Sequence, residues 1–184
     1  MKLALFTLFA AVTAFSYWLR SINLAHLKRY GNEVPKGFEN AIDAEKLRTS
    51  SAYTFDSSRL GLWESLFDNA LVVLFLFCGL ITVYDRFITS LTCSFTLSAI
   101  LFFLVLTWVQ SLLDIPFHLY GTFRIEARYG FNTMTPRLWL MDLLKSQAIG
   151  SFLLALLDGA AFWLIQWSPA RWWIWVWAFM AVFS

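Results

Sequence analysis

The stretch that decides the fold class is Ile88–Leu113, ITSLTCSFTLSAILFFLVLTWVQSLL, which holds 26 residues and no charged side chain. As a helix it would rise about 39 Å, which exceeds the roughly 30 Å of a bilayer's hydrocarbon core. The whole chain is 59% apolar and only 14% charged, whereas a soluble domain is close to half apolar and a quarter charged. The sequence therefore predicts an all-α integral membrane protein.

Four more apolar stretches predict a polytopic bundle of about five spans within one membrane domain, 1–184. The expected spans are 3–19, 66–84, 88–113, 148–167 and 172–184. Because only Asp85, Arg86 and Phe87 separate the second span from the third, we expect these two to form an antiparallel hairpin. The last span has 13 residues and is too short to cross a bilayer. We therefore expect that it is truncated and that the sequence belongs to a longer polypeptide.

Two hydrophilic stretches, 20–65 and 114–147, are expected to be loops on the same side of the membrane. Within the first, 43–49 and 57–65 could form short helices. The two loops carry most of the basic residues: Arg20, Lys28, Arg29, Lys36, Lys46, Arg48, Arg59, Arg124, Arg128, Arg137 and Lys145. Only Lys2, Arg86 and Arg171 lie on the other side. The positive-inside rule then predicts cytoplasmic loops and an exoplasmic N-terminus.

The first apolar run, 3–19, also resembles a cleaved secretory signal. Cleavage would place the basic loop that follows it outside the cell, so the charge bias favours a retained span. The short N-terminus favours a bacterial inner membrane over the endoplasmic reticulum.

Several function classes find no support in the residues. A net charge of +2 is too balanced to indicate nucleic-acid binding, and Cys78 with Cys93 makes no disulfide framework. No HExxH, CxxC or GxSxG motif occurs. His26 and His118 lie far apart without a neighbouring acidic or cysteine cluster, so they do not predict a zinc site. We predict no catalytic residue and no metal ligand in this chain.

Polar residues inside the apolar stretches are the first group of candidates. A carboxylate such as Asp158 at mid-span costs about 2.5–3.5 kcal/mol on insertion scales. It indicates a proton relay, an ion site, a chamber wall or a hydrogen-bonded packing contact. The third span carries a polar stripe of Thr89, Thr92, Thr96, Thr107, Gln110 and Ser111, which could line a cavity or pack helices closely. Asp158, Thr96 and Gln110 are the candidate chamber-lining residues.

A second group lies in 117–146, FHLYGTFRIEARYGFNTMTPRLWLMDLLKS. Gly130 and Asn132 suit a turn with positive φ. Thr135 followed by Pro136 predicts a helix N-cap, with an amphipathic helix over 137–145. The charged residues that could form ion pairs here are Arg124, Glu126 and Arg128.

The run TFRIEARYGFN, followed by Thr-Pro and Asp-Leu-Leu-Lys, resembles the hallmark loop of the type I CAAX prenyl proteases. These are integral-membrane zinc metalloendopeptidases. The upstream Val34-Pro35, Phe38 and Ser58–Gly61 and the closing WWIWVWAFMAVFS are also similar to that family. The resemblance runs from about Leu24 to the end of the chain and implies a ring of long helices around a water-filled intramembrane chamber.

In that family an HExxH helix and a later glutamate hold zinc, in a C-terminal half beyond this sequence. The resemblance thus implies the N-terminal, chamber-forming portion of a zinc-dependent membrane endopeptidase that acts on prenylated or other membrane-associated peptides. Expected partners are the bilayer, those peptides and the C-terminal zinc domain, with zinc in the full-length parent and no activity in this chain alone. A non-catalytic scaffold or adaptor, or a small transporter using Asp158, are the alternatives.

The hallmark loop is expected to dock the zinc domain or to frame the path by which substrate enters. Its candidate residues are Arg124, Glu126, Arg128, Asn132 and Thr135.

Overall fold

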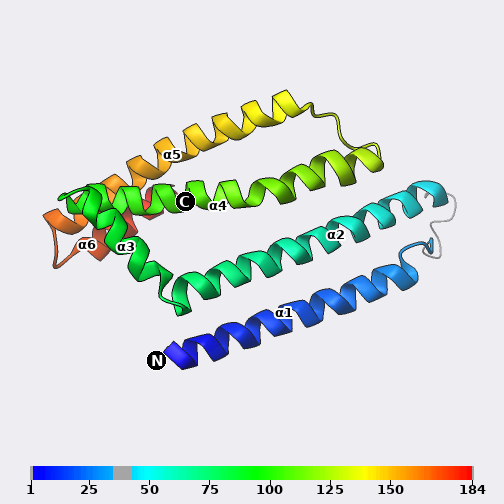
Figure 1. Ribbon diagram of the computed structural model, residues 1–184, viewed down its shortest axis with the longest axis horizontal. Helices are drawn as coiled ribbons and strands as arrows, with labels where there is room; N and C mark the ends of the chain where they lie inside the picture. Colours follow the sequence, from blue (N-terminus) through cyan, green and yellow to red (C-terminus); the bar gives the residue numbers. More distant parts are fainter. Residues whose placement is uncertain (1, 35–42, 184) are drawn as a thin grey trace. The chain divides into compact units, whose positions relative to one another are not determined.

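The computed structural model describes residues 2–34 and 43–183, and throughout that part the regular elements are helices, with no strand. In chain order they are α1 (Lys2–Tyr30), α2 (Ala44–Val72), the π-helical η1 (Val73–Phe77), α3 (Leu80–Leu91), α4 (Phe95–Tyr120), the π-helical η2 (Gly121–Glu126), α5 (Pro136–Trp167) and α6 (Trp172–Phe183) (Figure 1). The predicted all-α class is confirmed. Pro35 and Phe38, two of the residues that carried the family resemblance, lie outside the described residues.

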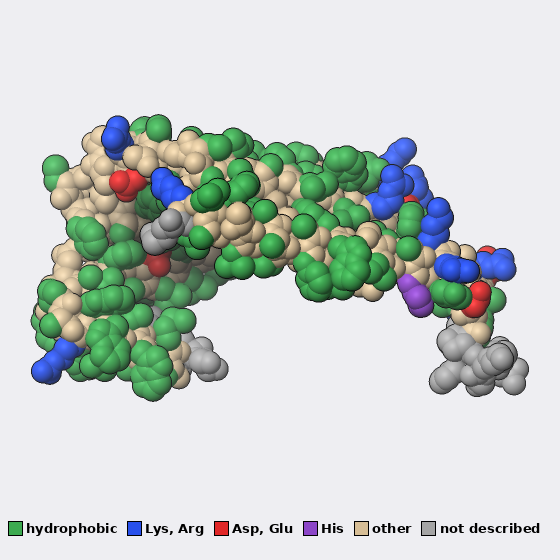
Figure 2. Space-filling model, turned by 90° about the horizontal axis from the view of Figure 1, so that it is seen from below, with side chains coloured by type: hydrophobic (Ala, Val, Ile, Leu, Met, Phe, Trp, Pro, Cys, Tyr) green, Lys and Arg blue, Asp and Glu red, His purple; other side chains and the backbone are tan. Residues whose placement is uncertain are grey.

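Four helices are long and apolar enough to cross a membrane: Lys2–Tyr30, Ala44–Phe77, Phe95–Glu126 and Pro136–Trp167. Across the described part of the chain, Ile88 and Ile125 are the only buried hydrophobic residues, and large apolar side chains are exposed along every long helix. Figure 2 shows hydrophobic side chains spread along the visible helix surface, with few charged side chains among them. Such a surface is costly in water but matches lipid, as expected for helices that are solvated by a bilayer.

The connection between the second and third predicted spans was placed wrongly. Asp85, Arg86 and Phe87 lie inside α3, not in a turn. The chain instead turns at Gly79, whose φ of 83° is in the left-handed region that favours glycine, and again before α4. There Ser94 Oγ accepts a hydrogen bond from the Leu97 N–H at 3.4 Å. Charged side chains can occupy a helix, so their presence did not mark its end.

The predicted loops 20–65 and 114–147 are largely helical. In the first, α1 continues to Tyr30 and α2 begins at Ala44, where Asp43 accepts a hydrogen bond from the Glu45 N–H at 3.0 Å. The short helices expected at 43–49 and 57–65 belong almost entirely to this one helix. In the second, α4 and η2 reach Glu126, and the helix expected at 137–145 is the start of α5. Polar residues show where a helix can leave the hydrocarbon, but its backbone hydrogen bonds continue beyond that point.

The first of two compact units comprises the chain up to Leu80 together with Asp114–Met134. In this unit α1 and α2 run antiparallel and side by side (Figure 1). Three contacts lie along α1 and the continuous helix of α2 and η1: Phe6 with Phe77 of η1, Tyr17 with Asn69, and Arg20 with Gly61. On α2, Phe67 contacts Phe117 and Leu60 lies against Gly121, so α2 also runs antiparallel to the end of α4 and η2.

The second unit comprises Ile81–Leu113 and the chain from Thr135 onward. Side chains of α4 meet those of α5 in antiparallel order. Gln166 Nε2 donates to Thr96 Oγ1 at 2.9 Å, and Trp108 Nε1 donates to Ser151 Oγ at 2.9 Å. Between these two hydrogen bonds, Ile100 lies against Gly159. Interhelical bonds between small hydroxyl and amide groups are a common way for membrane helices to associate.

Candidate functional site

The segment from Ala127 to Met134 is held against α2 by hydrogen bonds to Asp56. The Arg128 Nη1 donates to Asp56 Oδ2 at 2.9 Å, and the Tyr129 hydroxyl donates to the same oxygen at 2.8 Å. The Asp56 side chain is 25% exposed and that of Arg128 is 55% exposed. Asp56 Oδ2 therefore accepts two hydrogen bonds at a half-buried position, and both are strengthened by the negative charge of the carboxylate.

Aromatic rings one helical turn away on α2 extend this attachment. The ring of Tyr53 meets that of Tyr129 edge to face, with centroids 5.7 Å apart, and that of Phe131 edge to face at 4.9 Å. Edge-to-face pairs add about 0.5–1.5 kcal/mol beyond the area that they bury. Polar and aromatic contacts together hold the segment against one face of α2. We call Tyr53, Asp56, Arg128, Tyr129 and Phe131 the loop anchor.

The backbone of the segment is fixed by its own hydrogen bonds. The Glu126 carbonyl accepts from the Phe131 N–H at 2.9 Å and from the Asn132 N–H at 3.3 Å. Gly130 has a φ of 75°, so the positive φ predicted there is confirmed. The same prediction for Asn132 is wrong, because positive φ occurs only at glycines among the described residues. Asn132 Oδ1 instead accepts from the Met134 N–H at 2.6 Å, an Asx turn.

The ion pairs expected among Arg124, Glu126 and Arg128 do not form in the described structure. Arg128 is directed to Asp56, whereas Arg124 is exposed on η2 and Glu126 is half-buried. The predicted cap at Thr135 is confirmed: its Oγ1 accepts from the Leu138 N–H at 3.3 Å, and Pro136 is the first residue of α5. The role of these residues in docking or substrate access stays a prediction.

Partial burial and the contacts of the loop anchor raise the pKa of Tyr129. Partial burial raises the pKa of the Tyr129 hydroxyl above its usual value of 10.0, and the hydrogen bond to Asp56 and the negative charge of that carboxylate raise it further. Arg128 acts in the opposite direction with a smaller effect. Tyr129 is therefore a neutral hydrogen-bond donor at physiological pH.

The three candidate chamber-lining residues do not form one cluster in the second unit. Thr96 and Gln110 lie fourteen residues apart on α4, which corresponds to about 21 Å along its axis. Thr96 is bonded to Gln166, and Asp158 is half-buried on α5. The predicted single polar stripe is wrong for Thr89, which lies on α3, and for Thr92, which precedes α4. Whether Asp158, Thr96 and Gln110 face water stays a prediction.

The described residues do not fit a zinc site. Within the described ranges, no group of three or more His, Cys, Asp and Glu side chains could hold a metal ion. The imidazole of His26 packs against Tyr30, with ring centroids 4.8 Å apart, and His118 lies in the last turn of α4. We therefore assign no metal-dependent step to this chain.

Sequence reasoning missed the α2 side of the loop anchor. Tyr53, Asp56, Leu60 and Phe67 follow one another at intervals of three, four and seven residues, which places them on one helical face. That periodicity could have indicated a helix packed against another element, but 20–65 was expected to be mostly loop. Asp56 consequently had no predicted partner.

The helices and their connecting segment define the class: a multi-pass helical membrane protein with a short, well-anchored polar segment between two long helices. Residues 23–184 match the family described as "CAAX prenyl protease N-terminal, five membrane helices". The chain belongs to this family, and the family resemblance seen in the sequence is confirmed.

Individual relatives agree. The chain is 26% identical over 177 residues to "CAAX prenyl protease 1 homolog" of Caenorhabditis elegans, covering 95% of this chain and 39% of the relative. It is 30% identical over 162 residues to "Probable CAAX prenyl protease 1" of Schizosaccharomyces pombe, covering 79% and 33%. The fold is similar to that of the "Crystal Structure of S. mikatae Ste24p", with a TM-score of 0.84 and 20% identity, covering 95% of this chain and 42% of that one. The chain thus spans well under half the length of these relatives.

Proposed function

We propose that this chain forms the membrane portion of a zinc-dependent endopeptidase that cleaves after the prenylated cysteine of membrane-associated peptides. The match over residues 23–184 to a family of prenyl proteases carries the proposal, and the names of the relatives agree with it. In this proposal the chain supplies a lipid-facing helical wall and a substrate path. Zinc and the hydrolytic residues come from a protease domain formed by other residues.

The loop anchor suggests how such a domain would be positioned. A segment that must support a neighbouring domain has to keep one conformation, and here Asp56 and Tyr53 hold it while Gly130 and Glu126 set its backbone. Arg124 is left exposed next to this support and could pair with an acidic group of the docked domain. We assign to this segment the docking of the zinc domain.

The charge distribution supports an orientation for this arrangement. Eleven of the fourteen Lys and Arg residues lie in 20–65 and 114–147. We propose that the loop anchor and the protease domain lie on the cytoplasmic side and that the N-terminus is exoplasmic.

Single-cysteine labelling at Thr133 and at Ser168 with a membrane-impermeant maleimide, in a Cys78→Ala/Cys93→Ala background, tests this orientation. Labelling of the Ser168 position alone in sealed, right-side-out cells is expected, and labelling of the Thr133 position would contradict the orientation.

The functional test uses the purified chain in lipid nanodiscs and a fluorescent peptide ending in a farnesylated CAAX sequence. We expect the farnesylated peptide to bind more tightly than the same peptide without its lipid, and we expect no cleavage with or without added zinc. Fluorescence anisotropy measures binding and mass spectrometry of the peptide measures cleavage. Equal affinity for the two peptides would contradict the proposed substrate. Cleavage that a chelator abolishes would contradict the assignment of hydrolysis to a separate domain.

A further inference from the structure

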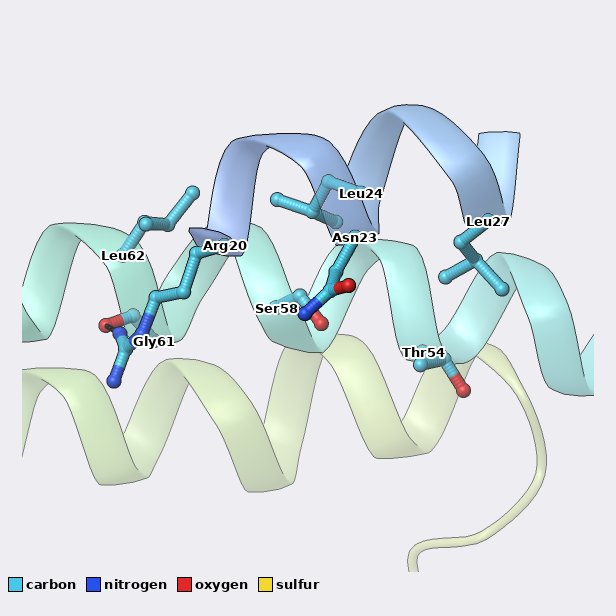
Figure 3. Close-up of a pocket in the computed structure, with 8 residues that line it drawn as sticks. All are labelled: Arg20, Asn23, Leu24, Leu27, Thr54, Ser58, Gly61 and Leu62. Carbon is cyan, nitrogen blue, oxygen red and sulfur yellow. Dashed lines mark hydrogen bonds between the residues drawn. The ribbon is translucent and has the colours of Figure 1, made fainter. Parts of the chain in front are cut away.

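A groove between α1 and α2 in the first unit has a volume of about 310 Å³, which lies within the roughly 300–1,000 Å³ typical of small-ligand sites. Arg20 and Asn23 reach from α1 toward α2, where Gly61 and Ser58 lie beside them (Figure 3). The walls combine one cation, neutral polar groups and leucine side chains. This groove is separate from the loop anchor and was not predicted from the sequence.

Arg20 brings an unneutralised positive charge to the groove. Its Nη1 donates to the Gly61 carbonyl at 3.4 Å, a long hydrogen bond, and a guanidinium has five N–H donors. In the part of the chain that the structure describes, the ion pair within 4.0 Å is that of Arg128 with Asp56, not one of Arg20. Arg20 therefore retains donors and charge for an anion, and a phosphate accepts such a fork in bidentate geometry.

Neutral donors lie next to this cation. Asn23 is directed toward Ser58 in Figure 3, and neither side chain makes a hydrogen bond to another described residue. An amide and a hydroxyl can bond phosphate oxygens or headgroup hydroxyls. The polar residues are thus arranged along the groove from the charged end at Arg20 toward Thr54.

The position of the groove along α1 specifies the kind of anion. The uncharged apolar run 3–19 ends just before Arg20, and Trp18 lies two residues before that arginine. Arg and Trp at the end of an apolar run are typical of the membrane–water interface, which is the level of lipid phosphates. Leu62 lies beside Arg20 and Gly61 in the groove, while α1 continues from here into the hydrocarbon with Leu19 and other exposed apolar side chains.

We propose that this groove binds one anionic phospholipid. Its phosphate lies on the Arg20 guanidinium, its headgroup faces Asn23 and Ser58, and its acyl chains follow the apolar run 3–19. The lipid would fill the groove between α1 and α2 and would join the two helices at the membrane surface.

Native mass spectrometry of the purified, detergent-solubilised chain titrated with dioleoylphosphatidylglycerol tests the proposal. We expect one retained lipid, and about a tenfold or greater loss of affinity in Arg20→Gln. Arg29→Gln is the matched control, because Arg29 lies on the same helix over the Tyr30 ring and does not line the groove. It should lose less than about twofold. Arg20→Lys keeps the charge without the fork and should bind between wild type and Arg20→Gln.

Two further titrations identify the ligand. Dioleoylphosphatidylcholine has a phosphate but no net charge and should bind more weakly than the anionic lipid; equal affinity for the two lipids would overturn the proposal. Inorganic phosphate at millimolar concentration should not displace the bound lipid; displacement would show a site for free phosphate and overturn the proposal. Equal losses in Arg20→Gln and Arg29→Gln, or no loss in either, would also overturn it.

Discussion

Asp56 on α2 accepts a hydrogen bond from Arg128 at 2.9 Å, across a separation of 72 residues in the sequence. The same carboxylate oxygen also accepts from the neighbouring Tyr129 at 2.8 Å. Because Arg128 is more than half exposed, its charge adds little by itself. Tyr129 is less exposed than Arg128, so its hydrogen bond to Asp56 is better shielded from water. The pair therefore acts mainly as a geometric restraint that sets where the segment after η2 leaves α4.

Replacing Asp56 with Asn should lower the free energy of unfolding by about 1–2 kcal/mol. An exposed ion pair contributes about 0.2–1 kcal/mol, and a hydrogen bond to a charged acceptor is worth more than one to a neutral acceptor by about 1 kcal/mol. Thermal unfolding in detergent, followed by circular dichroism, measures the change. Glu33→Gln removes one carboxylate at an exposed position and should leave the melting temperature nearly unchanged. A melting temperature for Asp56→Asn equal to that of Glu33→Gln would show that the hydrogen bonds to Asp56 do not contribute to stability.

The pKa of Tyr129 predicts how stability depends on pH. Because partial burial and Asp56 raise this pKa in the folded state above 10.0, the protonated hydroxyl stabilises the fold. Its contribution is fully present below the unfolded pKa of about 10 and is lost as the pH rises through the folded value. Wild type should therefore lose stability above about pH 10 more steeply than Tyr129→Phe. Ultraviolet titration of tyrosinate, as a difference between these two proteins, should show the raised pKa. Asp56→Asn should move it back toward 10.

Gly130 and Gly150 should respond to alanine in opposite directions. Gly130 has a φ of 75°, and the left-handed region costs an L side chain about 1–2 kcal/mol, so Gly130→Ala should destabilise the protein by that amount. Gly150 lies inside α5, and a Cβ added there meets nothing within 4 Å. Gly150→Ala should stabilise by up to about 1 kcal/mol. Unfolding midpoints in a denaturing detergent give both signs, and a shift in the same direction for both would contradict this account.

The sequence was sufficient wherever a signal was local or depended on overall composition. Uncharged runs such as Phe95–Leu113, within α4, identify membrane helices because the cost of burying charge in lipid dominates every other preference. Thr135 with Pro136, and Gly130, predicted a cap and a turn because each residue type has a conformation that few others share. The family motif was specific for the same reason, since it combines several such residues in a fixed order.

Helix ends and long-range contacts could not be predicted as well from the sequence. Charged residues within 20–30 indicated where α1 could leave the hydrocarbon, yet the helix continues to Tyr30. A segment in water can be helical as well as a loop, so these charges did not mark the end of the helix. Asp56 could have been related to Arg128 only after α2 was seen as one helix, because the contact depends on α2 and α4 lying antiparallel. Tertiary packing of that kind leaves no mark within a single sequence window.

The hydrogen bond between Asn69 and Tyr17 should be measurable as a coupling within the first unit. Asn69 Nδ2 donates to the Tyr17 hydroxyl at 2.7 Å and to the Ser65 carbonyl at 2.7 Å, so one amide group joins α1 to α2. Hydrogen bonds between membrane helices average about 0.6 kcal/mol and reach about 1.7 kcal/mol, so Tyr17→Phe should destabilise within that range. Combined with Asn69→Leu, it should cost less than the sum of the two single changes, since either change already removes the bond. Denaturing-detergent titrations of the four proteins give the coupling energy. Strict additivity would mean that the Asn69–Tyr17 hydrogen bond contributes nothing to the coupling of the two helices.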